Sequence, residues 1–198
     1  LNEEGISTLR FDQPNSGNSE GEYINSSFTE WINTIVFLAK KYLDMSYKVS
    51  LLGQSMGATA TVAASNKPDI KGKIPCLLLW VPDAKTTIDI NPNEVYEEGA
   101  QKYKGVFWTE AKNSNFFKCL EAYEGGIHLV YGDKDRFVEK ELMDKTIKIV
   151  KSKKQPFVVL KGQDHSPWDY DLVQKVYKEE LAKLKECMTG PQRITSAI

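Results

Sequence analysis

Several features that would assign a sequence to a functional class are scarce or missing here. The 198 residues include only three cysteines, at 76, 119 and 187, and two histidines. Cysteines that are odd in number, far apart and without a C-x-x-C pair argue against a zinc site or a disulfide framework. Cys76 lies inside the apolar run IPCLLLWV and is expected to be a small buried side chain. Reduced thiols suit a cytoplasmic protein, which is the compartment we expect.

Neither sign of charge dominates the chain. Lys and Arg number 26 against 27 Asp and Glu, which leaves a net charge of −1. No basic field is available to hold nucleic acid or an anionic membrane surface. The longest apolar stretches have the length of strands, well short of a membrane span. We therefore expect neither partner and favour a small-molecule substrate. Oligomeric state stays open.

The composition, 41% hydrophobic and 27% charged, is that of a globular domain long enough to bury a core. Apolar runs of strand length alternate with segments of helical periodicity. This alternation predicts an α/β fold, a mostly parallel sheet with helices on both faces. The expected strands are 5–12, 47–53, 73–81, 126–132 and 155–162, and the expected helices are 28–43, 55–65, 138–151 and 169–187. A capping box, Ser27 and Glu30, precedes the first of these helices.

The alternation stops between Pro82 and Glu124, where the chain is polar, aromatic and irregular. We expect helices near 93–104 and 113–123 and interpret 82–124 as a small cap insertion over an active site. A long decorated crossover is the alternative. The core then consists of residues 1–81 and 125–188, and residues 189–198 form a tail without periodicity, expected to be frayed.

A G-x-S-x-G pattern, GQSMG, stands where the strand 47–53 meets the next helix. It raises the hypothesis that Ser55 is a nucleophile. We expect that the positions of Gly53 and Gly57 both require a residue without bulk, because the strand packs closely on the helix that it starts. At the helix N-terminus, the N–H of Met56 is placed to stabilise an oxyanion. A five-residue pattern also occurs by chance in unrelated proteins. The hypothesis therefore needs a base and an acid elsewhere in the chain.

One of the two histidines is suited to be the base. His165 lies in the loop GQDHSPWDY, directly after the strand 155–162. Loops at the carboxyl ends of parallel strands are where ligands and catalytic groups gather in open α/β sheets. His128 lies in the middle of the strand 126–132, and we interpret it as structural.

Two aspartates, Asp133 and Asp135, follow the strand 126–132 and are candidates for the acid. Either is equally suited to be a helix cap or a turn residue. Asp164 adjoins His165, but neighbouring side chains rarely point together, so we expect it to brace the loop. With either of the first two, the order along the chain is Ser, Asp, His, the order associated with the nucleophile elbow.

These motifs resemble those of the α/β-hydrolase superfamily, in particular its branch with monoacylglycerol lipase-like, serine aminopeptidase-like and feruloyl esterase-like members. The resemblance runs from Leu1 to about Leu184. GQSMG matches the elbow and implies that Ser55 is the nucleophile. YGDKDRFV matches the family pattern G-x-x-D-x-x-V and selects Asp135 as the acid. GQDHS matches G-x-D-H and implies that His165 is the base.

Two departures from the family concern the N-terminal part. Its D-x-x-G-x-G-x-S loop corresponds to residues 12–21, with Pro14, Asn15 and Ser16 where Arg, Gly and His are usual. The family's first three strands are absent, so the second oxyanion donor is unassigned. The third of them would lie between 5–12 and 47–53. We therefore expect an N-terminally incomplete fold, either a piece of a longer protein or a sheet whose gap is closed unusually.

The resemblance implies a serine hydrolase that cleaves a carboxylic ester through an acyl-enzyme, with no metal and no organic cofactor. Thioesterase, peptidase or acyltransferase activity with the same triad, or an inactive fold used for binding, are the alternatives. Trp168, close after the base, is a candidate wall of the site. Further aromatic residues in the insertion line an acyl pocket or form its own core: Phe107, Trp108, Phe116 and Phe117.

Overall fold

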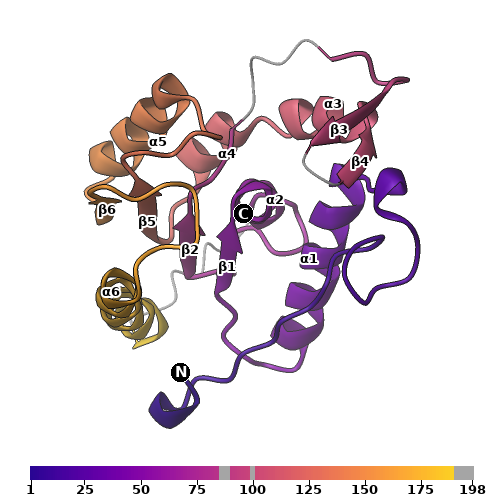
Figure 1. Cartoon of the computed structure of the whole chain (residues 1–198). Coiled ribbons are helices and arrows are strands. Elements are labelled where there is room, and N and C mark those ends of the chain that lie inside the picture. The colour runs from indigo at the N-terminus through magenta and orange to yellow at the C-terminus, as the bar shows by residue number, and fades with distance from the viewer. Residues whose placement is uncertain (85–89, 99–100, 190–198) are drawn as a thin grey trace.

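The computed structural model describes residues 1–84, 90–98 and 101–189. Its central sheet has four parallel strands (Figure 1). In spatial order they are β1 (Leu51–Gln54), β2 (Cys76–Trp80), β5 (Gly126–Gly132) and β6 (Phe157–Leu160). The helices that accompany them are α1 (Phe28–Asp44), α2 (Met56–Ser65), α5 (Lys140–Ser152) and α6 (Tyr170–Thr189). The predicted parallel α/β fold is confirmed for these elements.

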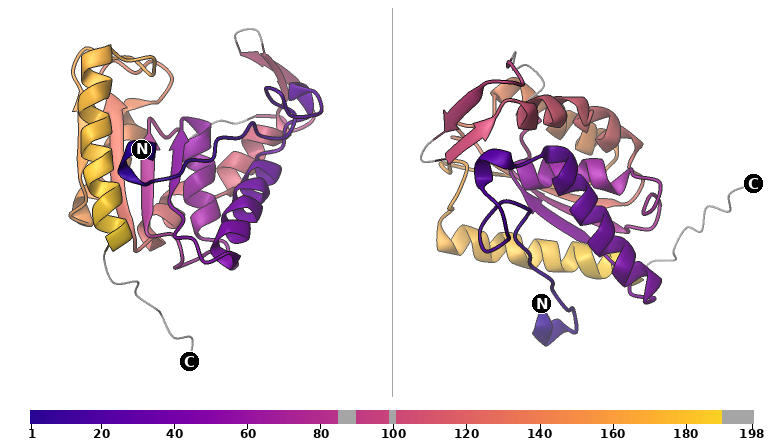
Figure 2. Two further views of the ribbon diagram at one scale, coloured as in Figure 1. Left: turned by 90° about the horizontal axis from the view of Figure 1, so that it is seen from below. Right: turned by 90° about the vertical axis from the view of Figure 1, so that its right-hand side faces the viewer.

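Helices cover both faces of the sheet. Figure 2 shows α6 on one side of the strands and α1 and α2 on the other. Leu77 and Leu79 of β2 point into the larger core with α2, whereas Cys76 and Leu78 face Leu184 of α6. All four of these β2 side chains are buried, because alternate residues of a strand point to opposite faces and both faces are covered here.

Helix α1 begins where the capping box predicts, although its cap comes partly from elsewhere. Ser27 Oγ accepts the N–H of Glu30 at 3.1 Å. A carboxylate from α3 (Val106–Asn113) completes the cap, because Glu110 Oε2 accepts both Ser27 Oγ–H, at 2.8 Å, and the N–H of Thr29, at 3.0 Å. The insertion is therefore hydrogen-bonded to the first turn of a core helix.

The strand predicted over residues 5–12 does not form. A short 3₁₀ helix, η1 (Asn2–Glu4), is followed by a stretch without regular structure up to a second one, η2 (Tyr23–Asn25). An extended segment becomes a strand only by pairing with a neighbour, and within the described part of the chain β1 pairs with β2 alone. The expected gap between two strands is therefore replaced by an open sheet edge at β1.

The insertion contains a hairpin where a helix was predicted over 93–104. Strands β3 (Val95–Glu98) and β4 (Gln101–Lys104) pair antiparallel. Tyr96 stacks on Tyr103, with centroids 6.2 Å apart, and Glu97 lies opposite Lys102. These cross-strand pairs stabilise a two-stranded ribbon. The prediction of a helix over the same residues took no account of such pairs and is wrong. The predicted helix near 113–123 is confirmed as α4 (Phe116–Ala122).

Several expectations concern absences or the ends of the chain. The tail expected to be frayed falls, from residue 190 onward, outside the described residues. Cys76, Cys119 and Cys187 are free thiols, and Cys76 is buried as predicted. Across the described ranges, no helix combines the length and apolar character that crossing a membrane requires.

Candidate active site

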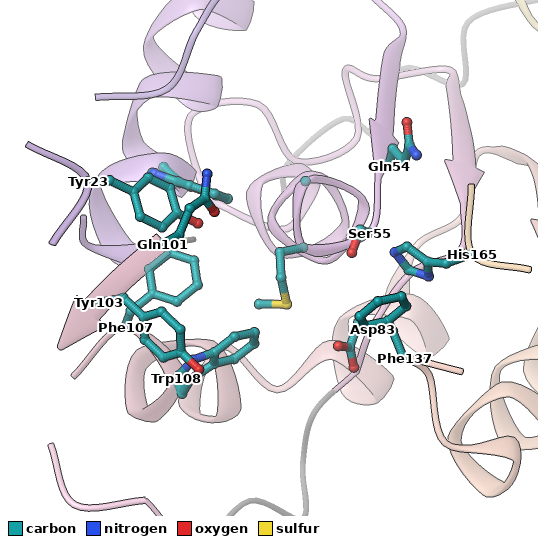
Figure 3. A pocket seen from close by; sticks show the side chains of 13 residues that line it. Tyr23, Gln54, Ser55, Asp83, Gln101, Tyr103, Phe107, Trp108, Phe137 and His165 are labelled. Atoms are coloured by element: carbon teal, nitrogen blue, oxygen red, sulfur yellow. The ribbon is translucent and has the colours of Figure 1, made fainter. Parts of the chain in front are cut away.

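Ser55 occupies a sharp turn between β1 and α2. Its backbone has φ 54° and ψ −127°, a combination that residues with a side chain rarely adopt. The turn is held from both sides, since Ser55 N–H donates to the carbonyl of Trp80 at 2.8 Å and Ser55 C=O accepts from Ala58 N at 2.9 Å. Although Ser55 is the N-cap residue, its side chain makes no capping hydrogen bond. Its hydroxyl is directed toward the cavity instead (Figure 3).

The two glycines of GQSMG have different roles. A Cβ at Gly53 would lie 2.5 Å from Gly57 O and 2.6 Å from Ala58 Cα, both of them backbone atoms. The first glycine is therefore required by the close approach of strand and helix. A Cβ at Gly57 would meet nothing within 4 Å, so the expectation that this second glycine must lack bulk is wrong.

The structure brings Asp135 and His165 together from two different loops. Asp135 Oδ2 lies 2.8 Å from His165 Nδ1. The other oxygen, Oδ1, accepts the N–H groups of Phe137 and Val138, both at 2.9 Å. The Asp135 side chain is fully buried and that of His165 is 15% exposed. A carboxylate held in this way fixes the imidazole orientation and leaves Nε2 to face Ser55 (Figure 3).

The pKa of Asp135 reflects opposing effects. Burial raises the pKa of this carboxyl, but the hydrogen bonds from His165, Val138 and Phe137 favour its charged form and lower the pKa below its ordinary value. Asp135 therefore stays ionised throughout the pH range in which histidine side chains ordinarily change charge. It can stabilise an imidazolium at its partner without itself taking up the proton.

The other two aspartates near the base support the backbone. Asp133 Oδ1 accepts the N–H of Gly162 at 2.6 Å, which ties the turn after β6 to the end of β5. Asp164 Oδ1 accepts the N–H groups of His165 and Arg136, at 2.8 and 3.1 Å. Hydrogen bonds from the His165 backbone and from Arg136 lower the pKa of Asp164. Asp164 thus braces the loop, as its position beside the base predicts.

A side chain next to the nucleophile reaches the loop of the base. Gln54 Nε2 donates to Ser166 Oγ at 2.8 Å. Gln54 precedes Ser55 and Ser166 follows His165, so this hydrogen bond joins the two loops one residue away from each candidate catalytic group. The loop also approaches β5 closely, since a Cβ at Gly132 would lie 2.3 Å from Gln163 O. Sequence reasoning missed this link, because nothing in the sequence pairs residues 54 and 166.

Trp168, a predicted wall of the site, is not among the residues that line the cavity beside Ser55. Its ring packs on that of Trp80, with centroids 5.0 Å apart, and its indole N–H donates to Asp164 O at 2.8 Å. The Trp80 indole N–H in turn donates to Glu180 of α6. Trp168 therefore lies beneath the loop of the base and supports it.

A cavity of about 540 Å³ opens beside Ser55 and His165 (Figure 3). Its wall opposite these two residues is aromatic and comes from α1, the hairpin and α3. Phe107 and Trp108, the candidates for an acyl pocket, belong to this wall, and they also pack against α1. Phe116 and Phe117 lie in the main core instead. The remaining lining residues are Tyr23, Trp31, Gln54, Met56, Gly57, Asp83, Gln101, Tyr103 and Phe137.

Most of these further lining residues were not singled out from the sequence. Trp31 lies on the apolar stripe of α1 and could not be told from a core residue by its spacing. Phe137 follows the acid by two residues, which is the one signal that could have found it. Tyr23 and Tyr103 reach the cavity only through the fold, from η2 and from the hairpin.

His128 and the possible metal ligands do not add to this site. His128 is buried between β5 and α6, with its ring nitrogens 3.5 and 3.6 Å from the carboxylates of Glu179 and Glu180. This placement agrees with its interpretation as a structural residue. Within residues 1–84, 90–98 and 101–189, no cluster of three or more His, Cys, Asp or Glu could hold a metal ion.

No protein-family model and no curated protein matches this sequence. Solved structures do match. Est1E from Butyrivibrio proteoclasticus, in a structure with bound ferulic acid, is 18% identical with a TM-score of 0.72, and the alignment covers 88% of this chain and 76% of that one. The monoacylglycerol lipase of Paleococcus ferrophilus is 17% identical with a TM-score of 0.72, over 89% and 82% of the two chains.

These structural similarities cover most of this chain. The chain has the α/β-hydrolase fold. The assignment rests on the arrangement of the strands and helices, since fewer than one residue in five is shared with either protein.

Proposed function

We propose that this protein is a serine hydrolase that cleaves carboxylic esters. Ser55 attacks the acyl carbon while His165 takes the hydroxyl proton, and Asp135 holds the imidazole and stabilises its charged form. The N–H of Met56 is at the first position of α2, where it has no acceptor within the helix, and stabilises the oxyanion. His165 then returns the proton to the leaving alcohol, and water releases the acyl group by the same steps.

One observation carries this proposal. The fully buried Asp135 carboxylate lies 2.8 Å from Nδ1 of an imidazole that faces a serine on a strained turn. A structural serine needs no positive φ at a strand–helix junction, and a structural histidine needs no buried acid behind it. The neighbouring folds support the same chemistry, since they include an esterase that binds ferulic acid and a monoacylglycerol lipase.

The shape of the cavity supports an ester with an aromatic or long apolar group. The wall that faces Ser55 carries Trp31, Tyr103, Phe107 and Trp108, which offer flat apolar surfaces. We further propose that the hairpin β3–β4 and α3 serve as the cap over this site. A volume of about 540 Å³ is within the range of small-molecule sites.

Labelling with a fluorophosphonate probe tests the nucleophile. The wild-type chain is expected to form one covalent adduct, and Ser55→Ala is expected to form none. Asp135→Asn should lower the labelling rate by roughly 10³- to 10⁴-fold, because the amide favours the wrong imidazole tautomer. Asp133→Asn is the matched control and should label at close to the wild-type rate, since an amide oxygen can still accept from Gly162. A wild type that does not label would contradict the proposal.

The cavity wall is tested with two tryptophans that are similarly buried. Trp108 lines the cavity and Trp168 does not. In a panel of aromatic and acyl-chain esters, Trp108→Ala should change the ranking of kcat/KM values. Trp168→Ala should lower all of the kcat/KM values without changing their ranking, because the Trp168 side chain acts only by supporting the loop that carries His165. Equal effects of both variants on the ranking would show that the aromatic wall does not select the substrate.

A further inference from the structure

A second group of reactive side chains lies at the opposite end of the sheet from Ser55. Cys76 is the first residue of β2, and Cys187 is in the last turns of α6. Together with Leu78 and Leu184, the two cysteines form a small apolar cluster between the sheet and this helix. The two cysteines are 111 positions apart in the sequence, so no local sequence pattern reveals their contact.

The geometry of the neighbouring strand brings the two sulfur atoms together. Cys76 lies in register with Gly126 of β5, so side chains at both positions point to the α6 face. The Sγ atom of Cys187 occupies the space beside Gly126, 2.3 Å from where a Cβ would be. The glycine thus leaves room for Cys187 directly next to Cys76, and both cysteines pack in the same apolar cluster.

The surroundings distinguish the two thiols. Lys183 lies one turn before Cys187, with its side chain only 10% exposed and its Nζ 3.2 Å from the Glu186 carboxylate. The neighbouring Cys76 thiol, with a smaller contribution from the Lys183 ammonium, lowers the pKa of Cys187, whereas burial and Glu186 act in the opposite direction. Cys187 is also the more exposed of the pair, since Cys76 is completely buried. Cys187 is therefore the thiol that can ionise and react first.

We propose that Cys76 and Cys187 form a dithiol site that is oxidised by low-molecular-weight disulfides. The Cys187 thiolate attacks one sulfur of the small disulfide, forming a mixed disulfide and releasing one thiolate. The Cys76 thiol then gives its proton to the released thiolate and attacks the Cys187 sulfur, which breaks the mixed disulfide and releases the second small molecule as a thiolate that takes a proton from water. One small disulfide is thereby reduced to two thiols, and the protein gains one disulfide that ties the end of α6 to β2.

Intact-mass measurement on the folded wild-type chain tests this proposal, with glutathione disulfide as the oxidant. After the reaction is quenched and the chain is unfolded in denaturant, maleimide should modify one cysteine where it modifies three in the untreated chain, and the remaining thiol should be Cys119. Cys119 is the internal control, because it lies on α4 and burial raises its pKa. The Cys119→Ser variant should lose both of its thiols and carry no glutathione adduct at the end of the reaction.

Two variants separate the roles of the pair. Cys76→Ser should stop at a mixed disulfide on Cys187, and Cys187→Ser should leave Cys76 unmodified. The oxidised wild type should melt about 5–10 °C higher than the reduced form, because the crosslink closes a long loop. A wild type that keeps three reactive thiols, or one that ends as a glutathione adduct, would overturn the proposal. Fluorophosphonate labelling of Ser55 in the same samples reports the proposed hydrolase separately.

Discussion

The hydroxyl group of Ser55 is left available for chemistry by the backbone around it. The carbonyl of Ser55 starts α2 and its N–H binds Trp80, so the main chain alone holds the turn. A serine at a helix N-cap ordinarily uses its side chain for that purpose. The positive φ of Ser55 is therefore a cost that the surrounding contacts sustain, and such strain is typical of functional sites.

The first prediction at this scale compares the two glycines beside Ser55. Gly53→Ala should lower the free energy of unfolding by about 2 kcal/mol or more, because its Cβ would overlap backbone atoms that cannot move aside. Gly57→Ala should leave it unchanged or raise it by up to about 1 kcal/mol, since alanine favours the helix. Urea denaturation measures both. Equal losses in the two variants would contradict the close approach at Gly53.

The second prediction concerns the hydrogen bond between Gln54 and Ser166. If it positions His165, Gln54→Ala and Ser166→Ala should each slow fluorophosphonate labelling by roughly 3- to 10-fold. The double variant should be no slower than either single one, because both changes remove the same link. Ser166→Thr keeps the acceptor and should label normally. Multiplicative losses would instead indicate that Gln54 contacts the probe itself.

The third prediction follows from the lowered pKa of Asp135. The unfolded chain takes up a proton near the ordinary value of 3.8, whereas the folded chain holds the carboxylate to lower pH. Asp135 therefore stabilises the fold above that value, and this contribution is lost as the pH falls through the folded pKa. In urea denaturation from about pH 6 to about pH 3, the free energy of unfolding should fall more steeply for the wild type than for Asp135→Asn. Parallel slopes would contradict this.

At the scale of elements, a hydrogen-bonded carboxylate connects the insertion to the core. Glu110 of α3 accepts two hydrogen bonds at the N-terminus of α1, where the helix dipole also favours a negative charge. The aromatic residues Phe28, Trp31 and Phe107 pack at the same junction, with ring centroids 4.9–6.4 Å apart. One wall of the cavity is thereby held in place by the start of α1.

This junction gives the fourth prediction. Glu110→Ala should lower the free energy of unfolding by about 1–2 kcal/mol, the typical cost of losing a helix cap. Glu121→Ala, on the neighbouring helix α4, changes an exposed carboxylate and should have little effect. Thermal unfolding measures both. Because α3 carries Trp108, Glu110→Ala should also raise KM for esters, while Glu121→Ala should not.

At the scale of the whole molecule, one edge of the sheet is open. Strand β1 pairs only with β2 among the described strands, and its Leu52 side chain is 55% exposed. Unpaired N–H and C=O groups beside an exposed apolar residue favour pairing with another chain. Residues 5–12 form no strand, so no other described strand covers this edge.

The fifth prediction tests this edge. In sedimentation velocity at increasing concentration, the wild type should self-associate and Leu52→Lys should do so less, because a lysine on an edge strand opposes pairing. Phe37→Lys is the control, since Phe37 is an exposed apolar residue, 66% accessible, that lies on α1. Both variants should label with fluorophosphonate at the wild-type rate. A larger effect of Phe37→Lys would place the contact on α1 instead.

Much of this protein followed from the sequence by itself. The order of β1, α2, β2, β5, α5, β6 and α6 was predictable because periodicity of apolar residues is a local property. Ser55 and His165 were identifiable because each stands at a junction where a predicted strand ends. The choice of Asp135 over Asp133 depended on a family motif, since both aspartates follow the same strand.

Tertiary structure alone decided the rest, because those features depend on which distant segments meet. Residues 5–12 have the composition of a strand, but a strand also needs a neighbour to pair with. Gln54 and Ser166 are 112 positions apart in the sequence, and Cys76 and Cys187 are 111 positions apart. Only the fold makes each pair neighbours. Local pattern thus determined most of the elements and two of the candidate catalytic residues, Ser55 and His165. Packing between elements determined which side chains support those residues and which line the cavity.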